Sequence, residues 1–240
     1  MEEKNTISAI RLLATHIDEL GLLAFDGPFL LNHQSIDELN RLHEAPPGGW
    51  NSLAALAVGL GFLRVTTQGY KSSDRLVKLP DNIEQALLQS FTRMLLPPRT
   101  AATLMQFIGL HPLAGLKIAR SLHQIYLPNA FDNRPGVELS EDLTIIRTFL
   151  LSFLDELVSY LALPDAYSFD NLVENCALLG KQFRSNLSTL VSDDRHFLNP
   201  LFPADHFCSS LVDDVLIPIG VVRRVDSAEL SIDHDFFSRL

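Results

Sequence analysis

The sequence predicts a mainly α-helical protein that carries small β-hairpins, and two observations lead to this fold class. Apolar residues recur every three or four positions in several segments, which is the period of an amphipathic helix. Two other stretches, residues 62–79 and 219–236, combine short apolar runs with a polar turn, which is typical of paired strands. With 240 residues and 47% hydrophobic content, the chain can bury one large core or two small ones.

The first two helices are expected in residues 7–24 and 35–43. The apolar positions of the first helix share one face, and they are Ile7, Ile10, Leu13, Ile17 and Leu20. The sequence FDGP at residues 25–28 breaks this helix. Ser35 is a candidate N-cap of the second helix, and Glu38 lies three positions later, which is the spacing of a capping box.

The third helix, residues 50–60, carries no charged side chain. It is expected to bury one face, made of Leu53, Leu56, Ala57 and Leu60. A hairpin follows, with strands expected in residues 62–67 and 75–79 and a polar turn between them. Pro80 ends the second strand, because proline cannot donate to a sheet.

The middle of the chain is predicted to be helical. Residues 129–142 are polar and contain Pro, Gly and Asn, so they are expected to form a loop or linker. Ser168 is a candidate N-cap for a helix that follows the break at residues 162–168. The helices expected from the apolar period lie in residues 81–96, on either side of the break at 109–112, and in residues 141–161 and 169–179.

The last part of the chain repeats the order of elements of residues 50–80. An apolar helix is followed by Gly220, a strand that carries Arg223, a polar turn, and a closing strand in residues 230–236. The earlier stretch has Gly61 and Arg64 at the matching points. Two interpretations stay open for the last part: a second copy of the first unit, or an ordinary hairpin packed on helices.

The order of helices and hairpin up to residue 80 resembles that of winged-helix domains. We therefore expect a winged-helix-like domain in residues 1–80, a helical region in 81–165 and a C-terminal unit in 166–240. With a second such unit, the chain resembles the kleisin-interacting tandem winged-helix proteins of chromosome-organising complexes. It also resembles the tandem winged-helix subunits of membrane-sorting complexes. These resemblances imply that the winged-helix surfaces contact protein.

A further resemblance is to the N-terminal dimerisation domain of small-molecule methyltransferases, which is also a helical winged-helix unit. In that family a Rossmann domain with a glycine-rich loop follows. No such pattern follows residue 80 in this sequence. This interpretation therefore requires the chain to be a fragment of a longer protein.

The acidic charge of the chain bears on nucleic-acid binding. The net charge is −10, whereas a protein that binds nucleic acid needs cations to neutralise phosphates. The helix in residues 50–60 offers only Asn51 and Ser52 for contacts with base edges. A DNA-binding regulator nevertheless stays an alternative, with contacts to the phosphate backbone from the basic residues of the hairpin, Arg64, Lys71, Arg75 and Lys78.

An uncharged helix is better suited to a protein partner than to a polyanion. The sequence therefore predicts a non-enzymatic interaction or assembly subunit, such as an adaptor or a dimer. The predicted interaction surface is the outward side of the helix, made of Trp50, Asn51, Ala54 and Val58. The expected partner is another protein or a second copy of the chain.

No pattern in the sequence predicts catalytic residues, a metal site or a cofactor. The sequence contains no Walker-type loop, no GxSxG and no HExxH, and its eight histidines are scattered. Cys176 and Cys208 lie in apolar surroundings and are expected to be reduced core thiols. A helical enzyme or ligand carrier with a pocket in residues 85–190 stays a third hypothesis. The sequence predicts no membrane span or signal peptide, which favours a cytoplasmic location.

Overall fold

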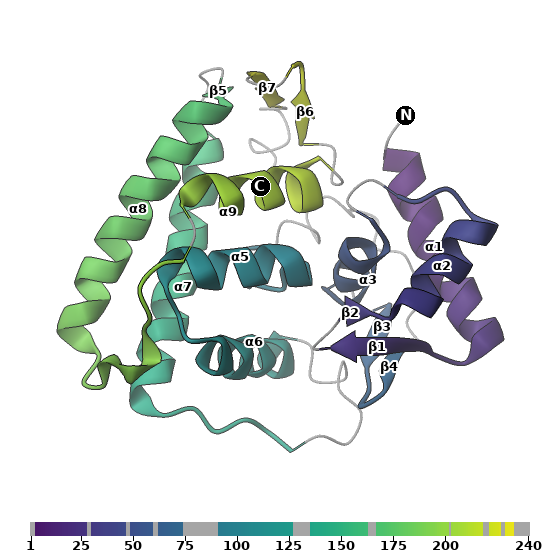
Figure 1. Cartoon of the computed structure of the whole chain (residues 1–240), viewed down its shortest axis with the longest axis horizontal. Helices are drawn as coiled ribbons and strands as arrows, with labels where there is room; N and C mark the ends of the chain where they lie inside the picture. Colours follow the sequence, from purple (N-terminus) through teal and green to yellow (C-terminus); the bar gives the residue numbers. More distant parts are fainter. Residues whose placement is uncertain are drawn as a thin grey trace.

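The structure, a computed structural model of the chain, is mainly helical with small antiparallel sheets (Figure 1). The predicted fold class is confirmed at this level. The structure describes residues 3–27, 30–46, 49–59, 62–73, 91–126, 135–162, 167–201, 203–217, 221–226 and 229–232. Within these ranges, no helix combines the length and hydropathy that a membrane span requires.

The N-terminal part combines three helices with a four-stranded antiparallel sheet. The helices are α1 (Glu3–Leu20), α2 (His33–Leu42) and α3 (Gly49–Gly59). The strands are β1 (Leu23–Gly27), β2 (Leu30–Leu31), β3 (Leu63–Val65) and β4 (Gly69–Ser72). Their order in the sheet is β2-β1-β4-β3, so the first strand of the chain pairs with the last one of the hairpin.

Two predicted helix boundaries in this part are wrong. The first helix ends at Leu20 and not at residue 24, because Gly21 adopts a φ of +79° and the chain then enters β1. Ser35 does not cap α2. The cap is Asn32, whose side-chain oxygen accepts a hydrogen bond from the N–H of Ser35 at 2.8 Å.

The first hairpin turns earlier than predicted. The hydroxyl of Thr66 accepts a hydrogen bond from the N–H of Gly69 at 3.1 Å and donates to its carbonyl at 2.8 Å. This local turn places β4 where the sequence predicted a polar loop. A side chain at Gly69 would overlap the backbone carbonyl of Leu23 in β1, so glycine is required there. The predicted return strand in residues 75–79 lies outside the described residues.

The remainder of the described chain is built from helices and a second small sheet. The longer helices are α5 (Pro98–Ile108), α6 (Pro112–Tyr126), α7 (Glu141–Leu161), α8 (Phe169–Leu190) and α9 (Ala204–Leu211). Two short helical turns are η3 (Asp194–His196) and the π-helical η4 (Val212–Leu216), which continues α9. The strands are β5 (Tyr167–Ser168), β6 (Val222–Arg224) and β7 (Glu229–Ile232), in the order β5-β7-β6.

The long helices α7 and α8 test the apolar-period predictions. The predicted bounds of α7 are confirmed, and so is Ser168 as the N-cap of α8, where its hydroxyl accepts from the N–H of Asn171 at 3.1 Å. The predicted end of α8 at residue 179 is wrong. The helix continues to Leu190, and Gly180 within it leaves room for the ring of Phe107 against its backbone.

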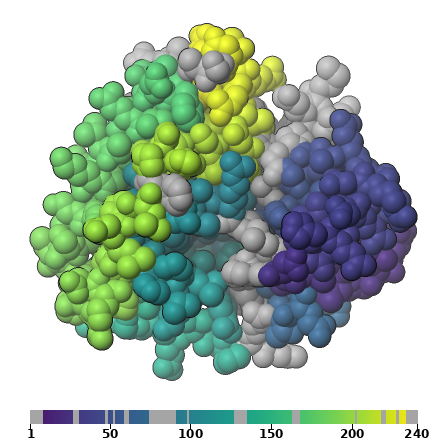
Figure 2. Space-filling model, in the orientation of Figure 1, coloured from purple at the N-terminus to yellow at the C-terminus, as the bar shows by residue number. Residues whose placement is uncertain are grey.

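Two clusters of buried apolar side chains form the described core. The first lies in the N-terminal part and joins α1, α2, α3 and the sheet. The second joins α5 to α9 with β6 and β7, and it includes Leu56 of α3. In Figure 2 the N-terminal residues, coloured purple to blue, lie beside the remainder. The predicted boundary at residue 165 does not coincide with a break in the second core, and the three-part division stays a prediction.

The two ends of the described chain repeat one order of elements. Leaving aside the two-residue strand β2 and the short turns η3 and η4, the first series is α1-β1-α2-α3-β3-β4, and the second is α7-β5-α8-α9-β6-β7. In each series the first strand pairs with the last strand, which also pairs with the middle one. The leading strands β1 and β5 were not predicted from the sequence, because each is short and has no alternating apolar pattern.

Candidate functional site

The predicted interaction residues of the uncharged helix lie inside the protein. Trp50, Ala54 and Val58 expose 3%, 0% and 1% of their surface, and Asn51 is half-buried. The indole N–H of Trp50 donates to the side chain of Asn40 at 2.8 Å. The side-chain oxygen of Asn51 accepts from a backbone N–H of β2 at 2.7 Å. The prediction that these residues form an exposed interaction surface is therefore wrong.

The helix α3 is enclosed because it has neighbours on more than one side. It contacts α1, β2 and β3 of the N-terminal part and also α5 and η4 of the helical part. Leu53 and Ala57 belong to the first core, whereas Leu56 belongs to the second. A helix that is apolar all round is expected to be buried. Burial therefore explains the absence of charge on α3.

The basic residues of the first hairpin are only partly described. Arg64 and Lys71 are paired across β3 and β4, so they lie on one face of the sheet. Arg64 is half-buried and Lys71 is exposed. Arg75 and Lys78 lie outside the described residues. Nucleic-acid binding by this hairpin stays a prediction, and a duplex titration at increasing salt tests it.

The helix α9 and its continuation η4 take the place in the second series that α3 takes in the first. Their apolar side chains, including Phe207, Leu211 and Val215, are also buried. Both α9 and η4 pack on α5, and η4 also contacts α3. Figure 1 shows α5 beside α9 and α3. In each series the apolar side chains of the third helix are therefore buried in the interior of the protein.

A buried carboxylate lies where η4 meets α5. Asp214 exposes 1% of its surface, and the hydroxyl of Thr100 donates to it at 3.5 Å. The exposed Arg99 approaches the carboxylate at 3.6 Å. Burial raises the pKa of Asp214, and the attraction of Arg99 offsets part of that effect. The charged form therefore costs folding free energy.

We expect Asp214→Asn to stabilise the protein at neutral pH. A carboxyl group with a raised folded pKa loses stability as the pH rises from its unfolded pKa through its folded pKa. An amide has the shape of the protonated acid and carries no charge. The gain should be present at pH 7 and shrink as the pH approaches the ordinary Asp pKa, about 3.9. Urea unfolding of both proteins across this pH range measures it, and an unchanging difference would contradict the explanation.

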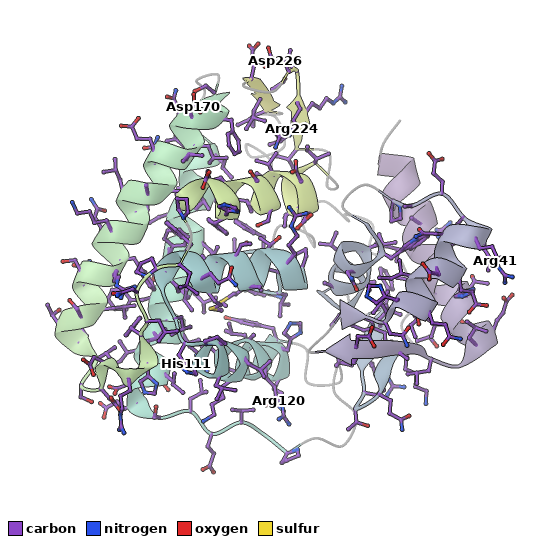
Figure 3. The ribbon with its side chains drawn as sticks, in the orientation of Figure 1. Arg41, His111, Arg120, Asp170, Arg224 and Asp226 are labelled. Carbon is purple, nitrogen blue, oxygen red and sulfur yellow. The ribbon has the colours of Figure 1, made fainter. Side chains whose placement is uncertain are left out.

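Exposed apolar side chains gather at the junction of α5 and α6, and we call this group the corner patch. Its members, with their exposed fractions, are Leu113 (66%), Leu116 (40%), Leu198 (41%) and Leu201 (66%). The first two are three positions apart on α6 and share a helix face. The other two are held beside them, since the N–H of Leu198 donates to Gly109 and that of Leu201 to Gln106, at 2.6 and 3.3 Å. His111 marks this corner in Figure 3.

Arg184 of α8 holds the two segments of the corner together. Its guanidinium donates to the carbonyl of Ile108 at 2.9 Å and to that of Leu198 at 2.6 Å. It also lies over the ring of Phe197, 5.8 Å from the ring centroid. Gly109 ends α5 between these groups with a φ of +70°. The corner patch therefore has a fixed backbone beneath it.

Sequence reasoning missed the corner patch, although two signals were present. Leu198 and Leu201 are apolar residues in a loop that contains Pro200, where polar residues are the norm. Leu113 and Leu116 begin a helix directly after a predicted break. Placing the loop beside α6 requires contacts between residues distant in sequence, which a pattern along the chain does not give.

The described residues offer little that resembles a catalytic or metal centre. They contain no group of three or more His, Cys, Asp or Glu side chains arranged to hold a metal ion. Cys176 and Cys208 are buried free thiols. Arg195 pairs with Asp193 at 2.6 Å and holds the pKa of that carboxyl at about 2, so the acid–histidine stretch at residues 193–196 forms a local ion pair. A cavity of about 340 Å³ lies between α6 and α7.

The comparisons with known proteins give no family for this chain. No protein-family model, no curated protein and no solved structure matches it. The resemblance to winged-helix domains therefore stays a prediction that rests on the order and pairing of the elements.

Proposed function

We propose that the chain is a non-enzymatic assembly subunit that contacts a partner protein through the corner patch. Its scaffold is a pair of winged-helix-type units whose third helices are used to join the two units together. The observation that carries the proposal is that α3 and α9 are buried against α5, whereas the four leucines of the corner patch are exposed.

The repeated topology supports the winged-helix assignment. Apart from the added strand β2 in the first, each series has the order helix, strand, helix, helix, hairpin. In each sheet the hairpin's last strand lies between the hairpin's first strand and the strand that follows the first helix. A hairpin of this kind covers an open side of a helical unit that is too small to bury its core alone. In this chain α5 covers a second side of α3. A DNA-binding winged-helix unit instead leaves its third helix uncovered, so that the helix can enter the major groove.

Charge supports a protein partner over nucleic acid or a second copy. The chain carries 29 acidic and 19 basic residues, so it repels both a polyanion and its own kind. Four exposed leucines on a fixed backbone suit the apolar centre of an interface. The proposed partner therefore presents an apolar centre and carries net positive charge, which speeds the encounter with an acidic chain.

We expect Leu113→Glu to abolish partner binding without unfolding the protein. Leu113 is 66% exposed, so a charge there costs little in the free chain but is unpaired in an apolar interface. The matched control is Leu20→Glu on α1, because Leu20 is 50% exposed and lies in the N-terminal part. The measurement is quantitative capture of proteins from the native host by the wild type and both variants, with circular dichroism of each.

The proposal predicts that one captured protein, of basic net charge, falls about tenfold or more with Leu113→Glu and is unchanged with Leu20→Glu. Equal capture by both variants would overturn it. The proposal would also be overturned if the wild type self-associates and Leu113→Glu abolishes this self-association. The corner patch would then bind a second copy of the chain and not a different protein. Sizing with light scattering distinguishes these results.

A further inference from the structure

The cavity between α6 and α7 is open to solvent, and its lining combines apolar side chains with the cationic side chain of Arg147. Its volume is about 340 Å³, which lies at the lower end of the range for small-molecule pockets. The apolar wall is formed by Ile125, Val137 and Leu139. The polar lining consists of Ser121, Gln124, Thr144 and Arg147, with Gly136 at the edge.

Arg147 is the charged group of this cavity. It is half-buried on α7, and one of its terminal nitrogens donates to the hydroxyl of Ser121 on α6 at 3.1 Å. Among the described residues, none of its contacts is an ion pair with a carboxylate. None of the described lining side chains is acidic, and the neighbouring Glu138 and Glu141 are exposed and are not among them. Within the described residues, Arg147 therefore carries a positive charge that no carboxylate of the lining balances.

The segment that contributes Gly136, Val137 and Leu139 to the lining is fixed to α6. The amide of Gln124 donates to the carbonyl of Pro135 at 3.0 Å and accepts from the N–H of Val137 at 3.0 Å. Arg120 donates to the same carbonyl of Pro135 at 3.2 Å, and it lies on the side of α6 that faces this segment (Figure 3). Three hydrogen bonds therefore hold this segment against α6.

We propose that this cavity binds a small carboxylic acid that has an apolar body. The planar guanidinium of Arg147 has further N–H donors, which match the two oxygens of a carboxylate. The hydroxyls of Ser121 and Thr144 lie in the same lining and can donate to the ligand. The ligand's apolar body packs on Ile125, Val137 and Leu139, which a compact inorganic anion cannot do. The residues that line this cavity are different from those of the corner patch. The ligand proposal therefore does not depend on the proposed partner binding.

Calorimetric titration of the full chain with hexanoate tests the proposal, with 1-hexanol and inorganic phosphate as comparison ligands. Hexanoate should bind saturably and about tenfold more tightly than butyrate, because it buries two more methylene groups. Hexanol should bind at least about tenfold more weakly, because it cannot make the charge-assisted bonds. Phosphate should not compete at equal concentration. Absence of saturable hexanoate binding, or equal binding of hexanol or phosphate, would overturn the proposal.

Variants locate the site. Arg147→Met should lower hexanoate affinity about tenfold or more, whereas Arg41→Met, at an exposed arginine on α2, should leave it unchanged. Ile125 is 55% exposed, so charges placed there should not disturb the fold. Ile125→Glu should weaken binding more than Ile125→Lys does, because both lose the apolar contact and only the glutamate repels the ligand's carboxylate. If affinity is the same in both Ile125 variants, the ligand is bound elsewhere and the proposal is wrong, even where Arg147→Met fails to fold.

Discussion

Ala54→Glu is expected to unfold the N-terminal part of the protein. The side chain of Ala54 is fully buried in the first core, among apolar residues of α1 and the sheet. A glutamate there must bury an unpaired charge, become protonated, or push α3 out of its site. Each course costs more than about 4 kcal/mol, which approaches the whole stability of a small domain. Circular dichroism and urea unfolding measure the loss.

The matched control is Ala177→Glu. Ala177 is an exposed alanine within α8, so the substitution makes the same chemical change on a helix that faces solvent. It is expected to change the free energy of unfolding by less than about 0.5 kcal/mol. If Ala54→Glu leaves the protein folded and as stable as the control, α3 faces solvent and the enclosed position described above is wrong.

Gly109→Ala is expected to be the second most damaging substitution. The glycine has a φ of +70°, which costs a residue with a side chain about 1–2 kcal/mol. An added Cβ would also overlap the guanidinium of Arg184 and the carbonyl of Leu198. Relief of that overlap breaks the hydrogen bonds of Arg184 to Ile108 and Leu198. We expect a total loss of about 3–5 kcal/mol in urea unfolding.

Gly21→Ala separates the backbone cost from the overlap. Gly21 has a φ of +79°, close to that of Gly109, and no atom lies within 4 Å of the position its Cβ would take. It should lose only the backbone contribution of about 1–2 kcal/mol. Equal losses in the two variants would mean that Arg184 does not hold the corner as described. The difference between them measures the contribution of that contact.

The sequence predicted most of the described helices and the strands β3, β6 and β7, but not the strands β1 and β5. The bounds of α7 follow from its regular apolar spacing and its Ser140 cap, both of which are local features. The strands β1 and β5 were missed because they owe their structure to β4 and β7, which are distant in sequence. Short strands such as Tyr167–Ser168 carry no period of their own. Pairing, which a pattern along the chain does not show, decides them.

The face of α3 was predicted wrongly for a physical reason. Leu53 and Leu56 were assigned to the buried face of the helix. Ala54 and Val58, which are smaller, were therefore assigned to the opposite face, as part of an uncharged exposed surface. The absence of charge all round a helix is better explained by neighbouring elements that bury it on both sides. The covering helix α5 begins at Pro98, far along the chain, so its position could not be read from residues 50–60.

The candidate sites show the same limit. The third hypothesis placed a pocket in residues 85–190, and the cavity between α6 and α7 lies in that range, but its donors were not identified. Arg147 stands in an apolar helix, where a charged residue faces solvent or a polar cavity. The corner patch needs the loop of Leu198 to be placed against α6, which depends on Arg184 of a third helix.

Quenching of the fluorescence of Trp50 by acrylamide tests the central claim most directly. Trp50 is the only tryptophan of the chain, so the emission reports on the start of α3 alone. The enclosed position predicts that native protein is quenched much less than protein unfolded in urea, and that its emission lies at shorter wavelength. Equal quenching and equal emission in the native and unfolded states would contradict the account, because α3 would then be open to solvent.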